Sequence, residues 1–175
     1  MDTIIEALRS LFTTAIAWAA TTDFLSHVNS VFYWKPAKIE QSLMPVIWIS
    51  PVNTVYEHKW TILDKKYHEV DITLIFHAKD YYNLTEWDDK KLYAVEAWIK
   101  MTEQMNADLW TKTKTICWII QSNIKLPYTD SEGVQRNACN FCTVQNVRYD
   151  LRGDGNFPTY EVTVTVQAIC IGDRS

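Results

Sequence analysis

The stretch HEVDITLIF, residues 68–76, decides the fold class that the sequence predicts. Side chains alternate along it, with Val70, Ile72, Leu74 and Phe76 in one set and Glu69, Asp71, Thr73 and Ile75 in the other. Successive side chains of a strand point to opposite faces, so this alternation predicts a half-buried strand. His68, the first residue of the apolar set, is expected to be a surface residue at the strand end.

Residues 86–110, which follow in the chain, predict one long amphipathic helix. Apolar side chains gather on one side of a helical projection of this segment and polar ones on the other. Glu86, Asp88 and Asp89 stand in its first turn, where acidic side chains suit the positive end of the helix dipole. A helix this long with one apolar side needs a sheet to pack on, and strand 68–76 would belong to that sheet.

The remaining elements follow from the same two periodicities. Residues 2–18 predict an amphipathic helix opened by a capping box between Thr3 and Glu6, and residues 22–29 predict a short second helix. Further extended segments are expected at residues 31–34, 45–51, 56–63, 66–77, 115–121, 141–151 and 159–171. Segments 56–63 and 66–77 would form a hairpin that turns at residues 63–66.

This order of elements predicts one α+β domain over residues 1–175. Its sheet would be mostly antiparallel, with the N-terminal helix and the long helix packed on it. Residues 122–140 form the longest irregular stretch and are expected to be a long loop, with a small hairpin inside it as the alternative.

Composition excludes several classes of function. The chain contains no run of about 18 apolar residues, so no membrane span is expected. A net charge of −4 argues against general affinity for nucleic acid, and 4 glycines leave no room for a phosphate-binding loop. No nucleophile elbow or metal-ligand spacing of histidines is present. We therefore expect no catalytic, cofactor-binding or metal-ligating residue, and no enzyme.

Cys139 and Cys142 form the one motif that could carry chemistry, a CxxC pair. A zinc site usually needs two such pairs, and Cys117 and Cys170 are isolated in sequence. We interpret all four as free structural thiols, with a thiol-based or zinc-dependent enzyme as the alternative.

Aromatic residues are unusually frequent, with 8 Trp and 9 Tyr. Such residues fill cores, but they are also enriched where subunits meet. Tyr81 and Tyr82 precede the long helix and Tyr93 falls on its polar side, so all three are candidates for a subunit interface. Within residues 122–140, the interface candidates are Pro127, Tyr128 and Arg136.

The order and texture of the elements resemble a known family. The stretches that carry the resemblance are the N-terminal helix, PVIWISP (45–51), EVDITLIF (69–76), the helix after Thr85, and YEVTVTV (160–166). Over roughly residues 2–171 the chain resembles the tail terminator, or tail completion, proteins of long-tailed bacteriophages.

The resemblance implies a structural virion protein without catalytic residues. Such a protein forms a homohexameric ring that caps the tail tube, stops its elongation and joins the tail to the head–tail connector. Its partners would be further copies of itself, the tail-tube protein and the connector, with DNA passing through the channel without specific binding. It would be assembled in the host cytoplasm and reside in the tail or neck of the virion. A head–tail connector or a tail-tube subunit is the alternative within virion proteins.

Overall fold

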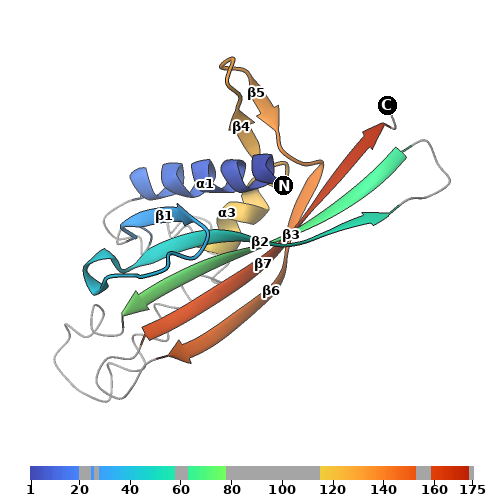
Figure 1. The fold of residues 1–175 in the computed structure, drawn as a ribbon. Coiled ribbons are helices and arrows are strands. Elements are labelled where there is room, and N and C mark those ends of the chain that lie inside the picture. The colour runs from blue at the N-terminus through green and yellow to red at the C-terminus, as the bar shows by residue number, and fades with distance from the viewer. Residues whose placement is uncertain (20–24, 26–27, 58–62, 78–114, 153–158, 174–175) are drawn as a thin grey trace.

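A five-stranded sheet in the order β1-β2-β3-β7-β6 runs through the centre of the molecule (Figure 1). The computed structural model describes residues 1–19, 25, 28–57, 63–77, 115–152 and 159–173. The strands are β1 (Ser30–Tyr33), β2 (Val46–Glu57), β3 (Leu63–His77), β6 (Phe141–Arg152) and β7 (Thr159–Asp173). β1 pairs with β2 in parallel, and the other three pairings are antiparallel. The α+β class with a mostly antiparallel sheet is therefore confirmed.

The predicted strand 68–76 lies within β3, the middle strand of the sheet. Its apolar set faces two helices, α1 (Asp2–Ala17) and α3 (Ile116–Ser122), and we call this side of the sheet the helix face. Val70, Ile72, Leu74 and Phe76 are each fully buried there. Central position and full burial explain why this stretch carries the clearest alternation in the sequence.

The other side of the sheet, the outer face, has a smaller core of its own. Val46, Trp48 and Ile75 are buried on it, and Ile39 and Met44 from the β1–β2 connection pack against them. Polar side chains continue this face, where Thr73 contacts Thr163 through their hydroxyl groups at 3.2 Å. The 3₁₀ turn η2 (Gln41–Leu43) lies in the same connection.

Helix α1 confirms the predicted N-terminal helix, which buries Ile4, Ile5, Leu8 and Phe12 at helical spacing. The predicted capping box is wrong. Met1 is the N-cap residue, no side chain caps the helix, and the Met1 carbonyl accepts from the amides of Ile4 and Ile5. Thr3 lies inside the first turn, where its hydroxyl cannot serve as a cap.

The predicted strand 115–121 is also wrong, because these residues form α3. Its buried residues Ile116, Ile119 and Ile120 follow the i, i+3, i+4 spacing of a helix. The Thr115 hydroxyl caps the helix by accepting from the Trp118 amide at 3.1 Å. A short, nearly continuous apolar run fits a buried strand and a buried helix equally well, so periodicity alone could not separate them.

The predicted hairpin joins the correct segments, with different boundaries. Residues 46–51 and 56–57 belong to one strand, β2, which ends at Glu57, and residues 58–62 lie outside the described residues. Residues 63–66 belong to β3 instead of a turn. Pro51 is tolerated inside β2 because β1 pairs only with Val46–Ile49, so the missing N–H falls beyond that partner. A bulge between Pro51 and Asn53 follows at once.

Residues 122–140 contain the small hairpin that sequence left as the alternative to a loop. β4 (Pro127–Thr129) pairs antiparallel with β5 (Gln135–Asn137) beside the N-terminal end of α1 (Figure 1). Ser122 still belongs to α3, and Leu126 is fully buried in the main core. The predicted long helix 86–110 and most of the predicted helix 22–29 lie outside the described residues.

Candidate functional surfaces

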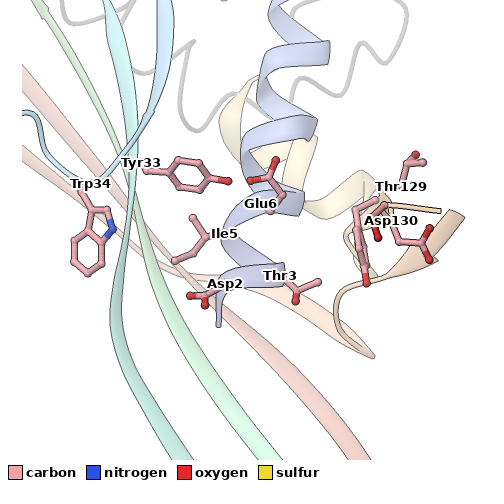
Figure 2. A pocket seen from close by; sticks show the side chains of 10 residues that line it. Asp2, Thr3, Ile5, Glu6, Tyr33, Trp34, Thr129 and Asp130 are labelled. Carbon is pink, nitrogen blue, oxygen red and sulfur yellow. The ribbon is translucent and has the colours of Figure 1, made fainter. Parts of the chain in front are cut away.

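An open pocket of about 550 Å³ lies between α1, the end of β1 and the β4–β5 hairpin. Figure 2 shows Tyr33 and Trp34 on one side and Thr129 and Asp130 on the other, with the first turns of α1 between them. The pocket is lined by Asp2, Thr3, Ile5, Glu6, Tyr33, Trp34, Tyr128, Thr129, Asp130 and Ser131. Its character is acidic and aromatic, a combination that suits protein contacts.

Trp34 is the most exposed aromatic residue of this pocket, at 60%. Its backbone adopts the left-handed region with φ of 58°, which is uncommon for a bulky side chain. Beside it, the guanidinium of Arg9 lies 4.8 Å from the centre of the Tyr33 ring and 4.0 Å from the Glu6 carboxylate. The face of the Tyr33 ring therefore already makes a cation–π contact with Arg9.

Asp130 shapes the hairpin rim of the pocket. Its Oδ1 accepts from the amides of Glu132 and Val134, each at 2.9 Å, and its Oδ2 accepts from Nε of Arg136. The Arg136 hydrogen bond, followed by the backbone amides, lowers the pKa of Asp130. Gly133 takes φ of 79° in the same turn. These contacts account for Asp130 as a turn residue.

A second surface lies on the outer face, at the end of the sheet away from the small outer core. Register places Phe141, Ile169, Tyr67 and Val55 opposite one another on β6, β7, β3 and β2, and we call this set the outer row. Phe141 is 43% exposed and Val55 is 49% exposed. Ile171, opposite Lys65 in the next position, is exposed to 40%.

Apart from Ile171, the residues that flank the outer row are polar. Asn53, Glu69, Gln167 and Thr143 form the neighbouring row toward the middle of the sheet. On the other side Glu57 accepts a hydrogen bond of 2.6 Å from the Tyr67 hydroxyl. An apolar strip bounded by polar residues is typical of a protein-binding surface.

The sequence-predicted interface residues fall into two groups. Tyr81, Tyr82 and Tyr93 lie outside the described residues. Pro127, Tyr128 and Arg136 all lie on the β4–β5 hairpin, where Pro127 is exposed and Tyr128 lines the pocket. Arg136 forms an ion pair with Asp130, so its role within this chain is to hold the turn.

Sequence reasoning missed Trp34, Val55 and Phe141 as individual surface residues. Trp34 precedes a Lys-Pro pair, and nothing in the surrounding sequence predicts its left-handed backbone conformation. Val55 and Phe141 look like ordinary strand residues, and their exposure depends on two bulges, one in β2 and one in β6 between Val144 and Asn146.

His68 is buried, in contrast to the surface position predicted for it. It is 6% exposed and shares the helix face with Val70, and its Nδ1 lies 3.0 Å from the Thr54 hydroxyl. Burial lowers its pKa, and the positive charges of the N-terminus and Lys66 lower it further. The prediction failed because β3 extends five residues before His68, to Leu63.

All four cysteines are free thiols, and three are close in space. Cys139 and Cys142 contact each other through a side-chain hydrogen bond, and Cys170 is near enough to feel the charge of Cys139. Within the part of the chain that the structure describes, no group of three His, Cys, Asp or Glu residues could hold a metal ion.

No protein-family model matches this chain, and neither does any curated protein. Among the described residues, no helix is both long enough and apolar enough to cross a membrane.

Proposed function

We propose that this chain is the subunit of a ring that terminates the tail of a long-tailed bacteriophage. The proposal joins the family resemblance of the sequence to one observation, the exposed outer row at the end of a long sheet. Figure 1 shows β2, β3 and β7 continuing past α1, so this end of the sheet projects from the helix layer. A neighbouring subunit could reach it without displacing the core.

A closed ring needs two different patches on each subunit, because every contact is head-to-tail. The outer row offers one patch. The acidic and aromatic pocket, with Tyr33 at 40% and Trp34 at 60% exposure, offers a second. The two patches use different residues of the chain, as a heterologous interface requires.

In this proposal six copies form the ring, one face of which caps the tail tube while the other binds the head–tail connector. DNA passes through the channel, and the net charge of −4 is consistent with passage without tight binding. The helix expected at residues 86–110 would add a longer helical layer to the sheet. The protein would reside in the tail or neck of the virion.

The first test is imaging of the purified protein together with its mass in solution. We expect six-fold rings in negative stain and a hexameric mass by light scattering. Stacked tubes would favour a tail-tube subunit, and monomers at all concentrations would contradict the ring.

A matched set of variants asks whether the outer row contributes to ring formation. Val55→Ser combined with Phe141→Ser should shift the mass toward monomer while circular dichroism stays unchanged, because both side chains are about half exposed in the single chain. Leu43→Ser is the control, since Leu43 is similarly exposed at 40% but lies on η2, beyond the other end of β2. A hexamer that tolerates the double variant would remove the outer row from the interface.

The functional test is a phage that lacks this protein. We expect filled heads and unattached tails, many of them overlong because elongation is not arrested. Attached tails of normal length would reject the terminator function, and heads that leak DNA would indicate a connector.

A further inference from the structure

The thiols beside the β4–β5 hairpin have no part in the proposed ring. Cys139 follows β5 by two residues and Cys142 is the second residue of β6. Residues three apart on a regular strand point to opposite faces, but here the chain bends at Ala138 and Asn140. Both residues belong to the core of the helix face, and a hydrogen bond joins their side chains.

Backbone hydrogen bonds hold this bend in place. Ala138 N–H donates to the Leu126 carbonyl at 3.0 Å, and Asn140 N–H donates to the Ile169 carbonyl at 2.9 Å. The Asn140 side chain accepts in turn from the Ile171 amide at 2.7 Å. The two thiols are therefore preorganised next to each other by contacts to the α3–β4 connection and to β7.

The two thiols differ in their contact with a pocket and in the direction of their pKa shifts. A pocket of about 350 Å³ is lined by Cys139 and Cys170 and not by Cys142; Cys139 is 6% exposed and Cys142 is 1% exposed. The hydrogen bond from Cys142 lowers the pKa of Cys139, whereas the same hydrogen bond and burial raise the pKa of Cys142. Burial raises the pKa of Cys170.

We propose that Cys139 and Cys142 form a redox-active pair that reacts with small disulfides, Cys139 as the attacking thiol and Cys142 as the resolving thiol. The Cys139 thiolate attacks one sulfur of the small disulfide RSSR, which forms a mixed disulfide and releases RS⁻. Cys142, once deprotonated, attacks the Cys139 sulfur and releases the second RS⁻. The protein loses two electrons and two protons, and RSSR gains both as two RSH.

Thiol–disulfide exchange is a chemical role that the CxxC motif can fill without a metal ion. The thiolate is the nucleophile in exchange, so Cys139, which lines the pocket and has the lowered pKa, reacts first. Cys142 then forms the disulfide with Cys139 within one chain. The inference does not depend on ring formation, because all of these residues belong to one subunit.

The test uses the full chain, reduced and then incubated with glutathione disulfide at neutral pH, followed by intact mass and peptide mapping. We expect a product lighter by two hydrogen atoms with a Cys139–Cys142 disulfide. Cys142→Ser should stop at one glutathione adduct on Cys139, and Cys139→Ser should react at least about tenfold more slowly, since the nucleophilic thiolate is gone.

Two controls separate this pair from the other thiols. Cys117→Ser and Cys170→Ser should both keep the wild-type product and rate. If Cys142→Ser fails to fold, as judged by circular dichroism, Cys142→Ala replaces it, because an alanine leaves no polar group in the buried site. A disulfide from Cys139 to Cys170, first reaction at Cys170, or no reaction until the protein is denatured would each overturn the proposal.

Discussion

Two buried polar side chains show how much local structure rests on one residue. Thr115, fully buried, supplies the hydroxyl that caps α3, and without it nothing in the run Ile116–Ile120 favours a helix over a strand. His68 is buried opposite Thr54 at the position where the helix face of β3 begins. Each residue satisfies a hydrogen bond that its burial makes obligatory.

Removal of the α3 cap should lower stability measurably. Thr115→Ala leaves the Trp118 amide without its acceptor, and loss of such a cap typically costs about 0.5–2 kcal/mol. Urea unfolding followed by fluorescence measures the change. Thr115→Ser keeps the hydroxyl and should lose much less, so equal losses in both variants would show that the methyl group, and not the cap, matters.

His68 should make the protein less stable on the acid side of neutrality. Its pKa is lowered in the folded chain, so the unfolded chain binds the proton more readily. The contribution is complete above the unfolded pKa, about 6.5, and is lost as the pH falls toward the folded value. The difference between the unfolding free energies at pH 7.5 and at a lower pH should be smaller in His68→Gln than in the wild-type chain.

Lys66→Gln provides the matched comparison for His68. It removes one of the positive charges that lower the pKa of His68 but leaves burial, the largest cause, in place. The dependence of stability on pH should therefore become shallower without disappearing. An unchanged slope in both variants would exclude His68 as its source.

At the scale of elements, strands were predicted well and the segment between them was not. β3, β6 and β7 carry long alternation that a half-buried strand imposes, and α1 carries the corresponding helical spacing. Segment 115–121 is too short for its hydrophobic periodicity to distinguish a helix from a strand. The β4–β5 hairpin has strands of three residues each, too short for any period.

The β4–β5 hairpin depends on Asp130 more than on its short strands. Asp130→Ala removes the acceptor for two backbone amides and for Arg136, so the turn should fray while the global melting temperature changes little. Amide hydrogen exchange at Val134 reports this directly. Ser131→Ala, one residue along the same turn, is the control and should leave exchange at Val134 unchanged.

The same turn should respond to acid in the wild-type chain. The pKa of Asp130 is lowered, so its contribution is present above the ordinary carboxyl pKa and is lost as the pH falls through the folded value. Exchange at Val134, corrected for its intrinsic dependence on pH, should then approach that of Asp130→Ala. Salt should weaken the Arg136 contribution, because this ion pair is exposed to solvent.

The whole molecule is organised by β3, which pairs with β2 and β7 along most of its length. The core on the helix face joins α1, α3 and four strands into one cluster. Leu74 lies in its middle, so Leu74→Ala should cost about 2–5 kcal/mol in unfolding free energy, while Val52→Ala, at 53% exposure, should cost under about 0.5 kcal/mol. Similar losses for both would mean that β3 is not the centre of the fold.

The candidate surfaces were less predictable than the fold for a physical reason. The alternation of apolar and polar residues along a strand predicts which of its sides is buried, and in this sheet the main buried side is the helix face. Phe141 and Val55 are exposed because they lie on the outer face, beyond the small core of Val46, Trp48 and Ile75, and this placement depends on the two bulges. Tyr128 was identified because it stands in a segment that sequence marked as irregular, and Trp34 was not.

The bulge in β2 acts as a phase shift in the strand. Odd-numbered residues such as Ile49 and Pro51 face the helices before it, and odd-numbered residues such as Asn53 and Val55 face the opposite way after it. Deletion of Val52 alone would remove the extra residue and restore a regular strand, with Val55 still on the outer face and Tyr56 still on the helix face. The bulge thus accommodates one additional residue while Asn53–Glu57 keep their partners on β3.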